Sequence, residues 1–344
     1  MTPLSPHDRK TVSFSRDTVN VFFHILTRCN LACAHCYINP AQHGGNTLAL
    51  DTICRWLDAF EPAGRRANLV LLGGEPTLHP DLAAAAAHAR KIGYDSITID
   101  TNGYLFCDIL NKTGPDVVDY ISFSLDGAVA ETNDALRGKG SYEACLSGIR
   151  RANERGFATS LIYTVGAANL HELPAMAELA GRLGISRMFI QVLGLRGKSA
   201  AGRQGAFAPA QAARKQWLEM VPAAARAVAD QGIIVTYPKV FLDDGEAFEC
   251  AGRVADNYFV FPNGRVYRCP LCEDFPIHSL AFENDRLVAT PRINEADLFE
   301  LDIPEGCVMN RLVQPGNLSC RPDGRPAWRI ACCMLKEEIT PNIS

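Results

Sequence analysis

The chain has 344 residues, with 34 basic against 38 acidic side chains and a formal net charge of −4. This length fits one large α/β domain with a smaller appendage, and the even charge balance argues against a nucleic-acid groove or an anionic membrane surface. Residues 1–16 lack the apolar run of a signal peptide, and no apolar stretch reaches transmembrane length. We therefore expect a cytoplasmic protein with neither nucleic acid nor membrane as a partner.

The first expected strand, residues 19–26, leads directly into Cys29, Cys33 and Cys36, spaced C-x3-C-x2-C. Three thiolates on one loop can hold three irons of a four-iron cluster and leave the fourth iron open to bind and reduce another molecule. The alternative is zinc, but structural zinc prefers four ligands, so the pattern favours iron and sulfur. Thirteen cysteines without an export signal also indicate metal ligation over disulfides. His35 is interpreted as a non-ligand.

Further apolar runs alternate with helical patterns up to residue 192. The expected strands are 67–72, 96–100, 117–124, 158–164 and 187–192. The expected helices are 52–60, 82–92, 142–155 and 170–183. This alternation predicts βαβ units and a parallel sheet, whose reactive residues gather at the C-terminal ends of the strands.

Short motifs follow these strands in a fixed order. They are Gly73-Gly74-Glu75-Pro76, Thr101-Asn102-Gly103, Ser124-Leu125-Asp126-Gly127 and Arg137-Gly138. Each alone could be a plain turn, but behind the three-cysteine loop they resemble the motifs of the radical S-adenosylmethionine (radical SAM) superfamily. The resemblance implies an α/β fold: a partial (β/α)6 TIM-type barrel.

The resemblance also implies the cofactors. Cys29, Cys33 and Cys36 would ligate a catalytic [4Fe-4S] cluster that binds S-adenosyl-L-methionine and cleaves it reductively to a 5′-deoxyadenosyl radical. An electron donor of the flavodoxin or ferredoxin type would supply the electron. In this interpretation the protein supplies position, electrostatics and exclusion of water.

Further residues would contact the cofactor. Glu75 would accept from its amino group, and Arg137 would bind its carboxylate with a planar fork. Gly73 and Gly74 would let the backbone approach closely. The other expected cofactor-binding residues are Asn102, Ser124 and Asp126 near the ribose or methionine end, and Gln191 and Val192 near the adenine.

Residues 194–205 are glycine-rich and basic, and are read either as a plain connector or as a lid beside the barrel mouth. The lid would bring Arg196, Lys198 or Arg203 to an anionic substrate group. A helix at 209–231 and a strand at 233–237 are expected next.

The last third of the chain is rich in cysteine. Residues 259–267 predict a β-hairpin with Asn263-Gly264 at its turn, flanked by Cys250 and Cys269. This resembles the opening of the auxiliary-cluster extensions called SPASM and twitch domains, although the full SPASM spacing is missing. The resemblance implies a second [4Fe-4S] cluster. Its expected ligands are Cys250, Cys269, Cys272 and Cys332, with Cys333 as the alternative to Cys332.

The remaining cysteines carry less information. Cys307 and Cys320 are interpreted as ordinary buried thiols or as further ligands. Cys54, Cys107 and Cys145 are interpreted as packing residues. The expected domains are an N-terminal tail at 1–18, a radical SAM core with its connecting helix at 19–238, and a cysteine-rich extension at 239–344.

Together these features predict a radical SAM enzyme with oxidoreductase or transferase-type radical chemistry. The radical would abstract hydrogen from a peptide or protein side chain, or from a small cofactor precursor, bound between the two clusters. A separate partner could recognise a peptide substrate. Candidate substrate-side residues are Asp100, Tyr163 and Glu273. The alternatives are a non-catalytic iron–sulfur redox protein or electron carrier, and a zinc-stabilised scaffold.

Overall fold

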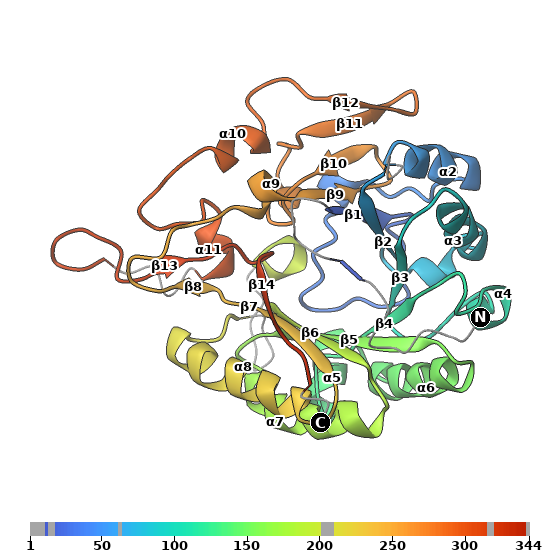
Figure 1. Cartoon of the computed structure of the whole chain (residues 1–344), viewed down its shortest axis with the longest axis horizontal. Coiled ribbons are helices and arrows are strands. Elements are labelled where there is room, and N and C mark those ends of the chain that lie inside the picture. The colour runs from blue at the N-terminus through green and yellow to red at the C-terminus, as the bar shows by residue number, and fades with distance from the viewer. Residues whose placement is uncertain (1–10, 13–17, 61–63, 201–209, 315–319, 342–344) are drawn as a thin grey trace.

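The computed structural model describes residues 11–12, 18–60, 64–200, 210–314 and 320–341. Its centre is a curved sheet of seven parallel strands that follow one another in chain order (Figure 1). They are β1 (Thr18–His24), β2 (Arg66–Leu72), β3 (Ser96–Thr101), β4 (Tyr120–Ser124), β5 (Ala158–Val165), β6 (Arg187–Val192) and β7 (Ile234–Pro238). The expected α/β architecture of a partial barrel is confirmed.

Helices pack around the outside of this sheet (Figure 1). The longer ones are α2 (Leu50–Asp58), α3 (Leu82–Lys91), α5 (Ala130–Arg137), α6 (Ser141–Glu154), α7 (Leu173–Arg182) and α8 (Arg214–Ala229). Shorter ones are α1 (Pro40–His43), α4 (Ile109–Lys112), η2 (Pro76–Leu78), η3 (Leu170–Glu172) and η4 (Gly197–Ser199). The sequence patterns missed α5, a mostly polar helix between two motifs, and its position matters for the site.

The two faces of the strands bury different side chains. Alternate residues such as Val21, Leu69 and Ile121 enter the hydrophobic core, since successive side chains on a strand point to opposite faces. The other face carries polar groups. There the amide of Asn20 donates to Asn257 at 2.9 Å and accepts from Asn68 at 3.0 Å. Because all three are buried, these bonds fix the relative register of neighbouring strands.

Asn257 belongs to the cysteine-rich part of the chain, which continues the same sheet. β9 (Asp256–Val260) pairs in parallel with β1, and the antiparallel strands β10 (Arg265–Tyr267), β11 (Leu280–Glu283) and β12 (Arg286–Ala289) follow. β9 and β10 form the expected hairpin, with Val266 opposite Val260. The proposed boundary at 238/239 is therefore crossed by strand pairing and remains a prediction.

The opposite edge of the sheet is also covered by the C-terminal part. β14 (Lys336–Ile339) pairs antiparallel with β7. The remaining elements are β8 (Phe241–Leu242), β13 (Arg329–Ile330), α9 (Ala251–Val254), α10 (Glu295–Phe299), α11 (Asn310–Val313) and η5 (Cys272–Asp274). The C-terminal third thus holds both edges of the barrel sheet.

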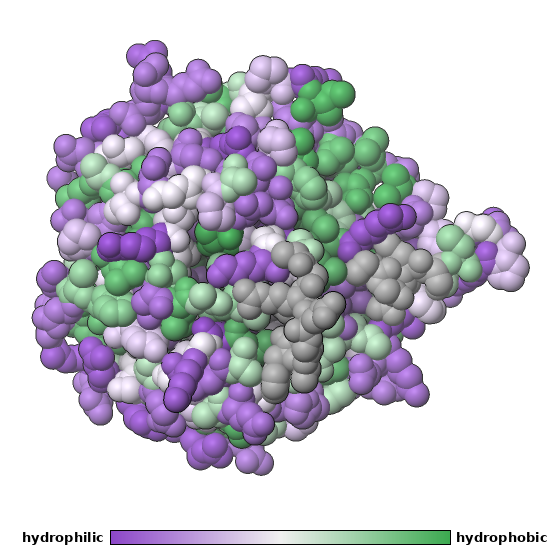
Figure 2. All heavy atoms as spheres, turned by 180° about the vertical axis from the view of Figure 1, so that it is seen from behind, coloured by the Kyte–Doolittle hydropathy of each residue, from purple (hydrophilic) through white to green (hydrophobic). Residues whose placement is uncertain are grey.

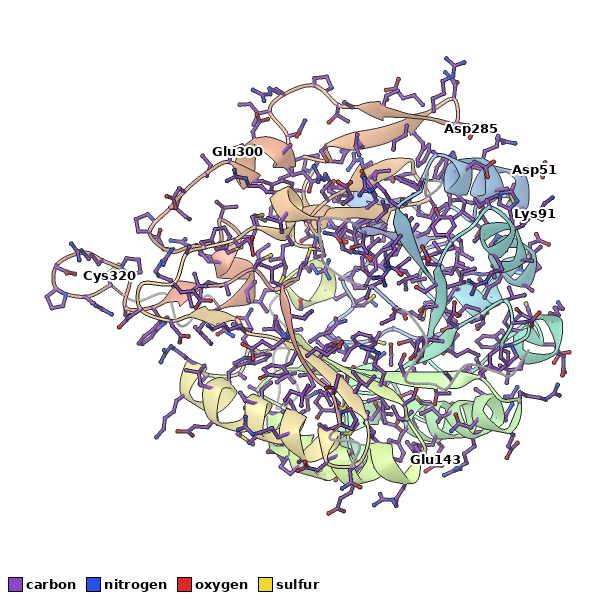
Figure 3. All side chains as sticks on the ribbon, viewed as in Figure 1. Asp51, Lys91, Glu143, Asp285, Glu300 and Cys320 are labelled. Carbon is purple, nitrogen blue, oxygen red and sulfur yellow. The ribbon has the colours of Figure 1, made fainter. Side chains whose placement is uncertain are left out.

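The β11–β12 hairpin folds back onto α2. The carboxylate of Asp285, at its turn, accepts from Trp56 Nε1 at 2.8 Å and pairs with Arg55 at 2.8 Å, and Figure 3 shows Asp285 near α2. The surface seen from behind mixes hydrophilic and hydrophobic residues (Figure 2). Within the described ranges, no helix has the length and apolar character needed to span a membrane.

Candidate functional site

The three-cysteine loop follows β1 and is docked on the C-terminal end of α5. The Ala34 N–H donates to the Leu136 carbonyl at 2.7 Å, and Cys33 Sγ lies 3.7 Å from the Arg137 carbonyl oxygen. His35 extends into the protein, where its Nε2 lies 3.0 Å from Asp126 Oδ2. The helix that the sequence patterns missed therefore holds the loop that they singled out.

Asp126 is the buried anchor of this arrangement. Its Oδ2 lies 2.6 Å from Arg137 Nε, and its Oδ1 accepts from the Thr164 N–H at 2.7 Å. Burial by itself would raise the pKa of Asp126, but Arg137 and then His35 hold that pKa well below its usual range. This carboxylate is fully buried and already paired with Arg137 and His35. The arrangement therefore does not favour the direct contact with a cofactor that the sequence predicted for Asp126.

The three thiols lie close enough to influence one another. Burial raises the pKa of Cys29 to about 11, and the neighbouring Cys33 and Cys36 add to this rise. The Leu31 N–H, which lies 3.4 Å from Cys29 Sγ, acts in the opposite direction and lowers the pKa. Among the described residues, no three His, Cys, Asp or Glu side chains converge as ligands of one ion. A four-iron cluster takes each cysteine on a different iron, so its ligands need not converge. The free thiols and the nearby N–H donor fit such a cluster.

Gly73 and Gly74 bring the end of β2 against the start of the cysteine loop. A Cβ on Gly73 would overlap the Leu26 carbonyl oxygen, and a Cβ on Gly74 would overlap that of Arg28. The Gly74 N–H donates to Leu26 O at 3.0 Å, a contact that only glycine permits here. The close approach found here is to the backbone of the cysteine loop, and the expected approach to the cofactor stays a prediction.

Glu75 is fully buried beside this contact. Its Oε1 accepts from the Thr77 N–H and from Thr101 Oγ1 at 2.8 Å, while its Oε2 accepts from the Asn102 N–H at 2.8 Å. Burial raises the pKa of Glu75, and these donors oppose the rise. Oε2 has the fewer donors and is the atom that could accept from a further cationic group.

Asn102 ties the end of β3 to the cysteine loop. Its Nδ2 donates to Asn30 Oδ1 at 2.7 Å and lies 3.8 Å from Cys29 Sγ. Two residues earlier, Asp100 faces Ser122, and burial raises the pKa of Asp100 to about 7 despite a hydrogen bond from Ser122. An acid of that pKa at the inner face of the strands can hold or release a proton near neutral pH.

The other sequence candidates divide into two groups. Ser124, Gln191 and Val192 lie at the C-terminal ends of β4 and β6 with partly or fully exposed side chains, where a ligand could reach them. Tyr163 was a wrong choice for a substrate-side residue. It lies on the opposite face of β5, fully buried in the core, and its hydroxyl donates to the Asn169 carbonyl at 2.7 Å. One step along a strand reverses the side of the sheet that a side chain occupies.

A second group of thiols surrounds a narrow cavity in the C-terminal third. Its lining is otherwise apolar and includes Phe248, Leu271 and Met334. The cysteines that line it are Cys250, Cys269, Cys307, Cys332 and Cys333. Cys272 interacts with Cys269, which places it at the same site. The free space is only about 20 Å³, little more than one water needs, so the thiols would have to separate to hold a cluster.

Cys307 was left open by the sequence, and its place in this cavity makes it a candidate ligand. Cys320, by contrast, is exposed on an outlying loop and is not a buried thiol (Figure 3). Cys145 is buried against Gly103 as a packing residue, as expected. Cys107 is exposed, so it is not a packing residue.

A buried carboxylate shapes the loop that carries Cys269. Glu295, at the first position of α10, accepts from the N–H groups of Arg268 at 2.6 Å and Cys269 at 3.1 Å, and from Ser279 Oγ at 2.8 Å. Burial raises the pKa of Glu295 to about 7, against the lowering effect of these donors. No sequence pattern had pointed to this residue.

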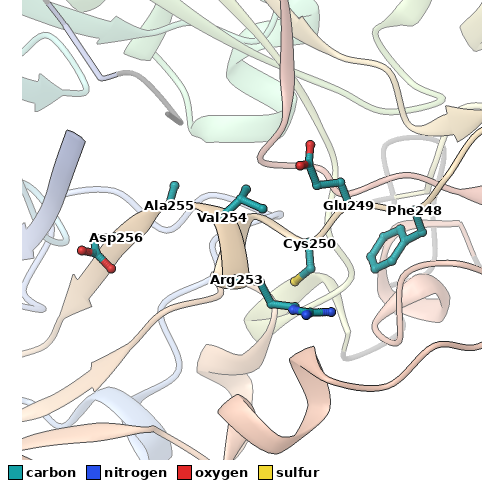
Figure 4. Close-up of a pocket in the computed structure, with 7 residues that line it drawn as sticks. All are labelled: Phe248, Glu249, Cys250, Arg253, Val254, Ala255 and Asp256. Carbon is teal, nitrogen blue, oxygen red and sulfur yellow. The ribbon is translucent and has the colours of Figure 1, made fainter. Parts of the chain in front are cut away.

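Cys250 also reaches the surface. It lines an open groove of about 520 Å³ together with Phe248, Glu249, Arg253 and residues 254–256. Figure 4 shows the Cys250 side chain between those of Arg253 and Phe248. The cysteine cavity therefore borders this open groove at Cys250.

Glu273 follows Cys272 and is buried against Arg196, whose Nη1 lies 2.5 Å from Glu273 Oε2. Burial raises the pKa of Glu273 to about 8, although Arg196 opposes the rise. Arg196 is thus engaged with the protein, which corrects the expectation that it meets a substrate anion. Residues 201–209, including Arg203, lie outside the described residues.

Comparison with known proteins agrees with this site. Residues 23–180 match the model of the radical SAM superfamily. The chain is 35% identical over 172 residues to Fe-coproporphyrin III synthase of Methanosarcina barkeri, covering 49% of this chain and 42% of that protein. It is 28% identical over 266 residues to PqqA peptide cyclase of Methylorubrum populi, covering 75% and 67%. The chain spans a little under half the length of the first of these relatives.

Among solved structures, anSMEcpe with bound AdoMet and the Kp18Cys peptide superimposes with a TM-score of 0.63 at 13% identity, over 92% of this chain and 93% of that one. At this identity the similarity shows the fold. Residues 23–180 therefore match a radical SAM domain, and the chain has the fold of a partial barrel.

Proposed function

We propose that the loop of Cys29, Cys33 and Cys36 holds a [4Fe-4S] cluster and that the chain cleaves S-adenosyl-L-methionine there. When bound, the cluster supplies the electron and the cofactor supplies a 5′-deoxyadenosyl radical. The radical would abstract hydrogen from a peptide or protein side chain, or from a small cofactor precursor. The observation that carries the proposal is the buried linkage of His35, Asp126 and Arg137, which fixes a loop of three free thiols beside Glu75.

The chain's own residues would prepare the site for this cofactor. Glu75 Oε2 would accept from the amino group, a charge-assisted bond in a buried place. Asn102 would orient the cysteine loop through Asn30. Arg137, held by Asp126 at Nε, retains its terminal nitrogens for a carboxylate. Ser124, Gln191 and Val192 would border the rest of the cofactor.

The substrate class is proposed from the relatives. The names of two of them specify a porphyrin and a peptide, and a flavodoxin or ferredoxin type of donor would serve either reaction. Asp100 and Glu273 are the substrate-side acids that the site still offers. Partial burial raises the pKa of Asp100 to about 7, and full burial raises that of Glu273 to about 8.

We further propose a second [4Fe-4S] cluster in the cysteine cavity. Its candidate ligands are Cys250, Cys269, Cys272 and Cys332, with Cys307 and Cys333 close enough to replace one of them. The donor set fits the group, because thiolates bind iron–sulfur clusters and the surroundings are apolar. The five lining cysteines exceed what a structural zinc needs.

The test uses the full chain, reconstituted with iron and sulfide under anaerobic conditions. Wild type should form 5′-deoxyadenosine from S-adenosylmethionine and a reductant, and the Cys29→Ala/Cys33→Ala/Cys36→Ala variant should form none. That variant should keep about four irons, those of the second cluster. Unchanged 5′-deoxyadenosine formation in the triple variant would refute the first proposal, and iron near zero would refute the second.

A further inference from the structure

The turn formed by residues 194–199 lies between the two cysteine sites. On one side it meets the three-cysteine loop: the Lys198 N–H donates to the Cys36 carbonyl at 2.9 Å. Gly197 has a φ of +56°, and a Cβ there would come 2.6 Å from the same Cys36 oxygen. The turn is therefore seated on the backbone of Cys36, and only glycine fits this contact.

On its other side the turn meets the loop that carries Cys269 and Cys272. The Arg196 Nη1 donates to the Pro270 carbonyl, within that loop, and to Glu273 Oε2 at 2.5 Å, directly after it. The Gly194 backbone packs against Leu271, whose Cδ2 would lie 3.1 Å from a Cβ on Gly194. Arg196 thus contacts one residue within the Cys269–Cys272 span and one directly after it.

The same arginine also reaches back to the first site. Its guanidinium carbon lies 4.6 Å from the centre of the Tyr37 ring, the residue directly after Cys36. The Tyr37 hydroxyl is fixed in turn by His24 Nε2 at 2.7 Å, at the end of β1. A cation over an aromatic ring is attracted by the ring face, and a partly buried one is attracted more strongly. One side chain, 19% exposed, therefore joins both cysteine loops.

A second link runs parallel to the first. Asn39 Nδ2 donates to Asp274 Oδ1 at 2.6 Å, and His43 Nε2 lies 3.1 Å from the Glu273 carbonyl oxygen. The segment after the three-cysteine loop is thus bonded to the segment after Cys272 at several points. Arg196 differs from these links because it contacts both loops while belonging to neither.

We propose that Arg196 is a positioning residue that holds the three-cysteine loop and the Cys269–Cys272 loop at a fixed separation, so that each site responds to the state of the other. Its consequence for metal and cofactor binding rests on the proposed function.

The first experiment needs no metal. Hydrogen exchange of the full chain is followed by mass spectrometry for wild type, Arg196→Met and Gly197→Ala, with Arg253→Met as control. Arg253 is 55% exposed and pairs with Glu300 at 3.6 Å. In both Arg196→Met and Gly197→Ala, exchange should rise in the peptides that cover residues 36–39 and also in those that cover residues 269–274. In the control variant, exchange should rise in neither set of peptides. A rise confined to one peptide, or no rise, overturns the proposal.

The second experiment measures coupling in the reconstituted protein, by the S-adenosylmethionine dissociation constant and the electron paramagnetic resonance spectrum of the three-cysteine cluster. Cys250→Ala/Cys332→Ala should weaken cofactor binding about five-fold or more in wild type, the lower end of typical coupling between sites. When Arg196 is already replaced by Met, the same two cysteine substitutions should have little further effect on the S-adenosylmethionine dissociation constant. Effects that multiply in the combined variant would overturn the coupling. Absence of cofactor binding in wild type would refute the proposed function and leave the exchange result to decide the role of Arg196.

Discussion

Arg137 Nε lies 2.6 Å from Asp126 Oδ2 in an ion pair whose side chains are 10% and 0% exposed. Asp126 lies shortly after the end of β4, and Arg137 is the last residue of α5, the helix on which the three-cysteine loop docks. The same oxygen of Asp126 lies 3.0 Å from His35 in that loop. One buried carboxylate therefore ties the loop to β4 and α5, in addition to the backbone contacts that the loop makes.

Asp126→Asn should destabilise the chain by about 3–5 kcal/mol, because it leaves Arg137 buried without its counter-charge. Urea unfolding in the presence of a chelator measures this. Glu143→Gln, an exposed carboxylate on α6, serves as the control and should change little. If Asp126→Asn lowers the free energy of unfolding by no more than Glu143→Gln does, the ion pair contributes no stability.

Asp100→Asn should change how stability depends on pH. Burial raises the folded-state pKa of Asp100 to about 7, above its ordinary value of 3.8, so the folded chain binds this proton more tightly. Stability from Asp100 is then present below about pH 4 and is lost as pH rises towards 7, by at most about 1.4 kcal/mol per pH unit. In Asp100→Asn, the urea midpoint should fall less steeply between about pH 4 and pH 7 than it does in wild type. The same dependence of the midpoint on pH in both proteins would contradict this prediction.

Glu295→Gln should loosen the Cys269 loop. An amide keeps the shape of the carboxylate but cannot accept at its nitrogen, so the N–H groups of Arg268 or Cys269 lose a partner, at a cost of about 1–3 kcal/mol. Amide exchange at these residues and at Ser279 should accelerate. Glu300→Gln, on the exposed side of the same region, should leave exchange unchanged.

Asn20→Leu should weaken the attachment of β9 to β1. The change leaves the Asn68 Nδ2 and the Asn257 Oδ1 without the partner that Asn20 provides, and each such loss costs about 1–3 kcal/mol in a buried place. The urea midpoint should fall, and replacing Asn257 as well should restore part of it. A double variant as unstable as the sum of both single variants would contradict a shared bond.

Much of the local structure could be predicted from the sequence. β6 has the expected bounds, the other barrel strands agree within a few residues, and the Asn263-Gly264 turn closes the expected hairpin. That Gly73 and Gly74 permit a close approach is visible in the sequence as an absent Cβ, but their contact with the cysteine loop was not predicted. The helix α5 was missed because its polar residues hide the apolar face that a periodicity search needs.

The chain's own amino acids determined its alternating strands and helices, its three-cysteine loop and its order of motifs, since each depends on residues near one another in sequence. Only the tertiary structure decided that Arg196 meets Glu273, that Asn20 meets Asn257, and that Tyr163 faces the core. The first two contacts join distant segments, and local spacing carries no information about such pairs. Tyr163 depends on which face of a strand packs inward, and a shift of one residue reverses it.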